Sequence, residues 1–227
     1  MKRKFSLLGV AAAAALSLAA QAANADVFIG LQQDAGPIVT VDSSAAGLAF
    51  FVGSFGEFED VGIVGLGQPT AVSPLLLQSV ATVSNGEGSA DAGTLTIYVT
   101  STGNTDPVGL TGFISGFATV NLSPGWVETM ETYIDPGNGV YALTTLLDDA
   151  TFNATDGFNE FAVANAGPGP FSKTAVYRIT APTHGGSSAA VSITAAAIPV
   201  PEPGSLALLG MALAGFGIIA RRRRKAA

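Results

Sequence analysis

Short stretches in the middle of the chain alternate polar and apolar residues with a period of two. The clearest example is Thr94–Thr100, whose residues are nearly all β-branched or aromatic. Ala175–Thr180 and Val191–Thr194 repeat the pattern more briefly. Because successive side chains of a strand point to opposite faces of a sheet, this alternation predicts strands with one buried face.

Glycine, asparagine, aspartate and proline separate these strands from one another and from further candidate strands. No long stretch between the two ends of the chain has the periodicity of a helix. Frequent turns between short strands favour two packed sheets over alternating strands and helices. The sequence therefore predicts an all-β fold, a single antiparallel β-sandwich of the Ig-like or jelly-roll-like kind, over residues 26–194.

The strongest turn signal is Asp135–Gly139, which reads Asp-Pro-Gly-Asn-Gly. Proline presets the φ angle of a turn, and glycine accepts the positive φ that hairpin turns require. The sequence therefore predicts that strands over Trp126–Ile134 and Val140–Leu146 form a hairpin around this turn.

The N-terminal residues have the three parts of a secretory signal peptide. The positively charged Lys2–Lys4 precede an apolar run from Phe5 to Ala20. Ala23 and Ala25 then supply the small residues that signal peptidase recognises. We expect residues 1–25 to be a signal peptide and the mature protein to begin at Asp26.

A second apolar run, Leu206–Ala220, ends in a cluster of basic residues. As a helix its 15 residues would span about 22 Å, which is shorter than the bilayer core of about 30 Å. We expect a linker at residues 195–203, a transmembrane helix at 204–220 and a basic cytoplasmic tail at 221–227. The helix is too short for durable anchoring, so it is typical of a processing signal.

Residues Val200–Lys225 closely resemble the PEP-CTERM sorting signal of Gram-negative bacteria. That signal consists of a Pro-Glu-Pro motif, a transmembrane stretch and a terminal arginine cluster. The matching positions are the motif residues Pro201, Glu202 and Pro203 and the basic residues Arg221, Arg222, Arg223 and Arg224.

The resemblance implies that an exosortase, a membrane protease or transpeptidase, uses this chain as its substrate. It also implies transient anchoring in the inner membrane and then release to the cell surface or extracellular matrix. A simple tail-anchored or single-pass membrane protein is the alternative.

The body of the chain is strongly acidic. Between Asp26 and Pro199 it holds 16 of the 17 acidic residues and only two basic ones, Lys173 and Arg178, a net charge of −14 against −7 for the whole chain. Because phosphate binding requires lysine and arginine, nucleic acid is not an expected partner. The absence of cysteine excludes disulfides, thiolate metal sites and a cysteine nucleophile.

The sequence gives little support for catalysis. The one histidine, His184, lies in a Pro-Thr-His-Gly-Gly turn, and no Gly-x-Ser-x-Gly elbow is present. No acidic pair stands out as the carboxylates of a glycosidase. We therefore expect no catalytic residues and no required cofactor.

Calcium is a weaker alternative for one acidic segment. From Asp149 onward, oxygen donors occupy the first, third, fifth and twelfth positions, as in calcium-binding loops. The sixth position is Ala154, where such loops have glycine. The candidate ligands are Asp149, Thr151, Asn153 and Glu160, and the alternative interpretation is an acidic loop between strands.

These observations predict an exported, non-catalytic protein with a structural or adhesive role in exopolysaccharide or biofilm. A secreted module that binds carbohydrate or calcium is an alternative, and a hydrolase and an ice-binding protein are more distant ones.

Trp126 follows a Pro-Gly pair, so it is either an exposed platform for a sugar or part of the core. Large aromatic residues usually pack in cores, which favours the second interpretation.

Overall fold

The computed structural model describes residues 25–68, 70–71, 74–86 and 93–198, and every regular element among them is a β-strand. The chain divides into two compact units, Met1–Ala196 and Ala197–Ala227, and the first holds all of these strands. The strands are β1 (Val27–Gln33), β2 (Val39–Ser44), β3 (Leu48–Phe55), β4 (Phe58–Gly67), β5 (Leu75–Asn85), β6 (Gly93–Asn104), β7 (Leu110–Leu122), β8 (Val127–Asp135), β9 (Thr145–Phe152), β10 (Asp156–Asn165), β11 (Phe171–Ala181) and β12 (Gly185–Ala196).

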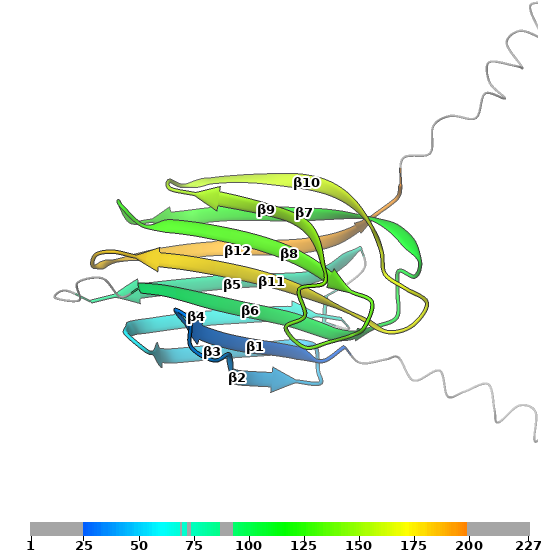
Figure 1. Cartoon of the computed structure of the whole chain (residues 1–227), viewed down its shortest axis with the longest axis horizontal. Helices are drawn as coiled ribbons and strands as arrows, with labels where there is room; N and C mark the ends of the chain where they lie inside the picture. Colours follow the sequence, from blue (N-terminus) through cyan, green and yellow to red (C-terminus); the bar gives the residue numbers. More distant parts are fainter. Residues whose placement is uncertain (1–24, 69, 72–73, 87–92, 199–227) are drawn as a thin grey trace, which may run out of the picture. The chain divides into compact units, whose positions relative to one another are not determined.

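The strands form two stacked sheets in which every pairing is antiparallel (Figure 1). The first sheet has the order β2-β1-β6-β11-β8-β9, and the second has the order β10-β7-β12-β5-β4-β3. Strands β5 to β12 form an eight-stranded jelly roll, with β5-β12-β7-β10 facing β6-β11-β8-β9. Strands β1 and β2 extend one sheet and β3 and β4 extend the other. The predicted β-sandwich is confirmed, and of its two forms the jelly roll is the one found.

Alternating burial along the strands follows the alternating sequence pattern. In β5, Leu77, Ala81 and Val83 are buried between the sheets, whereas Gln78 and Val80 are exposed on the outer face. Burying one such aliphatic side chain stabilises the fold by about 1.5–3 kcal/mol. The apolar core therefore holds the two sheets together in a chain that has no disulfide.

Trp126 belongs to this core. Its side chain is completely buried, and its Nε1 donates a hydrogen bond of 3.0 Å to the carbonyl oxygen of Thr183. The structure therefore supports the core interpretation of this residue over an exposed platform.

The hairpin predicted around Asp135–Gly139 is only partly right. Strands β8 and β9 do pair, but β9 begins at Thr145, and residues 136–144 form a longer loop. The loop follows from the carboxylate of Asp135, which accepts hydrogen bonds from the backbone N–H groups of Gly137 (3.1 Å) and Gly139 (2.7 Å) and from the Thr144 hydroxyl (2.7 Å). Burial by itself would raise the pKa of Asp135, but these donors together hold it below its usual value.

The same loop covers part of the outer face of the first sheet. Tyr141, at a φ of 56°, places its ring over Gly30, where a Cβ atom would lie only 2.7 Å from its Cζ. The Tyr141 ring also packs against Tyr98 at a centroid distance of 5.7 Å, and its hydroxyl donates to the Thr40 hydroxyl (3.0 Å). This face is therefore partly closed by the chain itself.

Lys173 is an unusual member of the core because its side chain is fully buried between the sheets. Its Nζ donates a hydrogen bond of 3.1 Å to the carbonyl oxygen of Leu76 and lies 5.5 Å from the centroid of the Phe171 ring. Burial lowers the pKa of Lys173 to about 7, because the charged form loses its hydration.

No helix long and apolar enough to cross a membrane occurs among the residues described. The predicted helix at 204–220 and most of the predicted signal peptide lie outside those residues.

We predict that Asp135→Ala lowers the free energy of unfolding by about 2–3 kcal/mol at pH 7, because three donors of the loop lose their charged acceptor. Urea denaturation measures this change. The matched control is Asp42→Ala, since the Asp42 carboxylate accepts only the backbone N–H of Phe50 (2.8 Å) among the described residues. We expect the control to lose about 1 kcal/mol. Equal losses in the two variants would contradict this role for Asp135.

We also predict that the protein becomes more stable as the pH rises from about 7 to about 9.5. In this range the lysine of the unfolded chain still binds a proton, whereas folded Lys173 has released it. The unfolded state then binds more protons, so stability rises by about 1.4 kcal/mol per pH unit. Urea denaturation across the range measures the slope.

Lys173→Met should remove this slope, and Arg178→Met should keep it, since Arg178 stays charged throughout the range. The series ends at about pH 9.5, where most of the tyrosine of the unfolded chain is still protonated. A slope that persists in Lys173→Met would show that another group is responsible.

Candidate functional site

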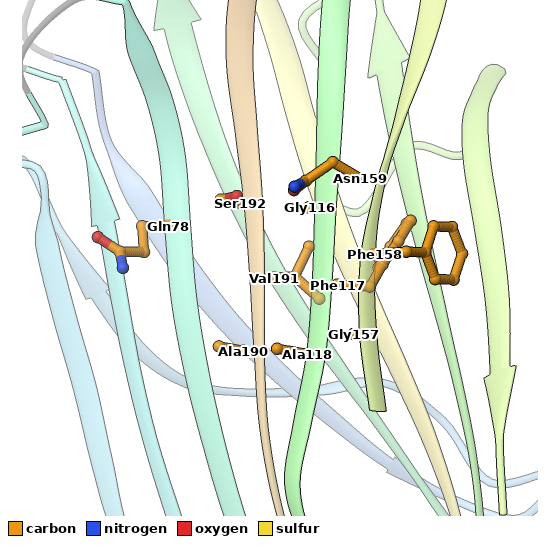
Figure 2. Close-up of a pocket in the computed structure, with 10 residues that line it drawn as sticks. All are labelled: Gln78, Gly116, Phe117, Ala118, Gly157, Phe158, Asn159, Ala190, Val191 and Ser192. Carbon is orange, nitrogen blue, oxygen red and sulfur yellow. The ribbon is translucent and has the colours of Figure 1, made fainter. Parts of the chain in front are cut away.

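A groove of about 330 Å³ lies on the outer face of the second sheet. It runs across β5, β12, β7 and β10 (Figure 2). We call it the outer groove, and its lining residues are Gln78, Gly116, Phe117, Ala118, Gly157, Phe158, Asn159, Ala190, Val191 and Ser192.

The strand register produces this groove by placing small residues side by side. Gly116 of β7 pairs with Asn159 of β10 on one side and with Ser192 of β12 on the other. One step along, Ala118 lies between Gly157 and Ala190. Because the height of a sheet surface depends on side-chain size, these two adjacent rows, in which every residue but Asn159 is glycine, alanine or serine, leave a trough.

Larger side chains border the trough. The next row of the same face consists of Phe161, Ile114 and Thr194. The tip of the Phe161 ring lies over Gly112, since a Cβ atom added there would meet its Cε2 at 2.7 Å and its Cζ at 2.8 Å. The residue is 39% exposed, so part of its side chain remains accessible to solvent.

Three polar side chains line the outer groove without a hydrogen-bond partner among the described residues: Gln78, Asn159 and Ser192. Figure 2 shows them in a row across the sheet, with Gly116 between Asn159 and Ser192. Two side-chain amides and one hydroxyl supply both donors and acceptors. Their hydrogen-bonding capacity is therefore available to a ligand.

The lining of the outer groove contains no ionisable side chain. The two basic residues of the acidic body are both engaged elsewhere, because Lys173 is buried and Arg178 forms an ion pair with Glu131 at 3.2 Å on the first sheet. The groove is therefore an uncharged strip on an acidic domain.

The polar groups on the outer face of the first sheet differ in that they bond to one another. The carboxylate of Glu131 accepts hydrogen bonds from Arg178 and from the hydroxyl of Tyr133 (3.0 Å), and the pKa of Tyr133 rises to about 12 through burial and then through Glu131. Threonine hydroxyls also pair across the strands, in Thr94–Thr180 (2.9 Å), Thr129–Thr151 (3.1 Å) and Thr100–Thr174 (2.9 Å).

A carboxylate lies between the sheets at Glu128, which is fully buried. Its Oε2 accepts hydrogen bonds from the hydroxyls of Thr119 and Ser187, both at 3.0 Å, and its Oε1 has no partner among the described residues. Burial raises the pKa of Glu128 against the opposing effect of these two hydroxyls. The group is enclosed by the core, where a substrate in solvent has no access.

The candidate calcium ligands come from both sheets. Asp149 and Thr151 lie on β9 in the first sheet, Asn153 lies in the turn after it, and Glu160 lies on β10 in the second sheet. Burial raises the pKa of the adjacent Asp148, and the nearby charges of Glu160 and Asp149 raise it further.

Among the residues that the structure describes, no group of three or more histidine or acidic side chains is arranged to hold a metal ion. The segment connects β9 of the first sheet to β10 of the second, and it has no flanking helices among the described residues. The calcium site stays a prediction.

The other predicted site residues are spread along the chain. His184 is exposed in the turn between β11 and β12. Ala25 is buried next to the start of β1. Ala23, the sorting motif Pro201–Pro203 and the cluster Arg221–Arg224 lie outside the described residues.

Comparison with curated proteins gives no match for this chain. Among solved structures, similarity is found to the bacteriophage CBA120 tailspike protein 4 enzymatically active domain, at 15% identity and a TM-score of 0.31. That alignment covers 65% of this chain and 19% of the tailspike chain, so this chain spans about a fifth of that protein.

Two further structures are similar to a comparable degree. TmCBM61 in complex with beta-1,4-galactotriose aligns at 12% identity and a TM-score of 0.31, over 63% of this chain and 92% of that one. A Clostridium thermocellum endo-1,4-beta-D-xylanase 10B fragment complexed with xylohexaose aligns at 11% identity and a TM-score of 0.31, over 67% of this chain and 25% of that one. TM-scores this low do not assign a function.

The profile of the PEP-CTERM protein-sorting motif matches residues 199–225. The match contains the Pro-Glu-Pro motif, the apolar run and the arginine cluster identified in the sequence. The chain therefore carries a PEP-CTERM sorting motif, which indicates that it is exported and sorted to the cell surface or the extracellular space.

Proposed function

We propose that this chain is a non-catalytic, adhesive component of the extracellular matrix that holds polysaccharide at the cell surface. The observation that carries the proposal is the outer groove, an open and uncharged strip with three polar side chains that have no partner among the described residues. Such a surface suits binding, because it offers hydrogen bonds without a reactive group.

The position of the titratable groups supports a role without catalysis. General acid–base chemistry requires a group within hydrogen-bond reach of the substrate. Glu128 and Lys173, two ionisable side chains with shifted pKa values, are enclosed between the sheets. His184 is exposed, but it lies in a turn and not in the groove.

The sorting motif supplies the route to the matrix. Signal peptidase removes residues 1–25, and the apolar run Leu206–Ala220 holds the exported domain transiently at the inner membrane. An exosortase then recognises Pro201, Glu202 and Pro203 and releases the domain. The shortness of the apolar run supports a temporary anchor, since a lasting one needs about 20 residues.

We predict that protein extracted from the cell surface lacks the peptide Leu206–Ala227. Replacing Pro201, Glu202 and Pro203 with alanine should leave this peptide attached and keep nearly all of the protein in the membrane fraction, because the protease no longer recognises its substrate. Mass spectrometry of the C-terminal peptide measures both results. Pro182→Ala, in the turn between β11 and β12, is the control and should be processed normally. Recovery of the intact C-terminus from surface-extracted wild-type protein would refute the processing step.

We further predict that the released protein sediments with the extracellular polysaccharide. In a strain that makes no polysaccharide, most of it should appear in the culture medium instead, because the adhesive partner is missing. Immunoblots of the matrix and medium fractions measure this distribution. The same distribution in both strains would mean that polysaccharide does not retain the protein.

A further inference from the structure

We infer that the outer groove binds a segment of a neutral, unbranched glycan, with Gln78, Asn159 and Ser192 as the hydrogen-bonding residues and Phe161 as the stacking platform. This inference rests on the proposed adhesive function and names the ligand class and the residues involved.

The groove has the length of a short oligosaccharide. Its lining residues come from four adjacent strands, β5, β12, β7 and β10. Neighbouring strands lie about 4.8 Å apart, so the row from Gln78 to Asn159 extends over about 14 Å. Because the row crosses the strands on an open sheet face, a ligand is able to continue beyond either end, as an internal segment of a polymer requires.

The chemistry of the row matches hydroxyl groups. The amides of Gln78 and Asn159 each offer a carbonyl acceptor and an NH₂ donor, and the hydroxyl of Ser192 offers both. A sugar hydroxyl likewise donates and accepts, so it is able to satisfy either kind of partner. These side chains leave their hydrogen-bonding capacity to the ligand because none of them bonds to another described residue.

The charge of the domain selects a neutral ligand. The body between Asp26 and Pro199 carries a net charge of −14, and the groove itself contributes no basic side chain that would attract an anion. An acidic polysaccharide would approach against this field, whereas a neutral one would not. Phosphate-bearing polymers are disfavoured for the same reason.

Phe161 provides an apolar surface beside the polar row. It lies two residues after Asn159 in β10, so both side chains are on the same face of the sheet. Its ring contacts the backbone at Gly112, and 39% of the residue is exposed. A partly exposed aromatic ring beside a polar row suits the apolar C–H face of a sugar ring, in a contact like those that aromatic side chains make with other apolar groups.

Gly116 keeps the centre of the groove open. A Cβ atom at this position would lie 2.6 Å from both the Asn159 Oδ1 and the Ser192 Oγ. Since Gly116 is not among the described residues with a positive φ, a larger residue fits its backbone, and the effect of a substitution is confined to the groove. Gly116→Val therefore fills the proposed site and displaces two of its polar groups.

Gly62→Val is a matched control. Gly62 lies on β4, on the outer face of the same sheet, and a Cβ atom there would meet nothing closer than the Thr82 carbonyl oxygen at 4.0 Å. The control therefore adds the same side chain to the same face without entering the groove.

The test uses the full chain, purified in a detergent without a sugar headgroup, and isothermal titration calorimetry. The probes are neutral hexaoses of β-1,4-linked glucose, galactose, mannose and xylose, together with polygalacturonate as the anionic probe. We expect the wild type to bind at least one neutral hexaose with a Kd below about 1 mM, and to bind polygalacturonate more weakly. Gly116→Val should weaken binding at least about tenfold, and Gly62→Val should change it less than about twofold.

A second variant protects the test against misfolding of Gly116→Val. The double variant Gln78→Ala and Asn159→Ala removes polar groups that have no partner in the described protein, so it should melt at the wild-type temperature and still bind at least about tenfold more weakly. Wild-type affinity in this folded variant would overturn the inference. So would the absence of binding to every neutral hexaose, or tighter binding to polygalacturonate.

The fractionation of matrix and medium separates this inference from the proposed function. If the wild-type protein stays with the matrix while Gly116→Val binds hexaose normally, the adhesive function is supported and the assignment of the binding site to the groove is wrong. If hexaose binding depends on the groove but the protein is never retained by polysaccharide in cells, the site stands and the adhesive function is wrong.

Discussion

The pairing register of the antiparallel strands is the constraint on which the rest of this structure depends. A shift of one residue would move every core side chain to the solvent face, so burial of the apolar face fixes the register. The same register also determines which residues become neighbours on the outer face. Gly116 is on the outer face because Phe117, one residue later, points into the core, and the register of β7 with β10 and β12 then places it between Asn159 and Ser192. The outer groove is thus a consequence of how the interior packs.

The sequence predicts the strands and the sandwich because both depend on local alternation. It does not predict the groove, whose residues come from strands as far apart in sequence as β5 and β12 and meet only through long-range pairing. The sequence feature that relates to the groove is the small residues at every second position, as in Gly116 and Ala118 or Ala190 and Ser192. The sequence predicts a hairpin turn at Asp135–Gly139 and misses the longer loop 136–144, because the turn residues are visible in sequence while the hydrogen bonds from Gly139 and Thr144 to Asp135 are not.

The sequence pattern also fails to predict the polar residues of the interior. Lys173 and Glu128 occupy inward positions of β11 and β8, where the alternation pattern expects apolar side chains. Their partners, the Leu76 carbonyl and the hydroxyls of Thr119 and Ser187, belong to the opposite sheet. Each hydrogen bond therefore links the two sheets at a defined place. Polar groups of this kind add little net stability, but they disfavour other alignments of the sheets, because misalignment would leave a buried polar group without a partner.

The polar side chains of the outer groove differ from those on the outer face of the first sheet in whether they bond to the protein itself. On the first sheet, threonine pairs, the Arg178–Glu131 ion pair and the loop that carries Tyr141 bond to groups of the protein itself. In the outer groove of the second sheet, the side chains of Gln78, Asn159 and Ser192 have no hydrogen-bond partner among the described residues. An exposed polar group with no protein partner bonds to water, and a ligand that replaced this water in the groove would not have to break a hydrogen bond within the protein. In a chain without cysteine, these side chains are free of any part in holding the fold together because the apolar core and the bonded groups of the first sheet already do so, which is the condition that the proposed binding requires.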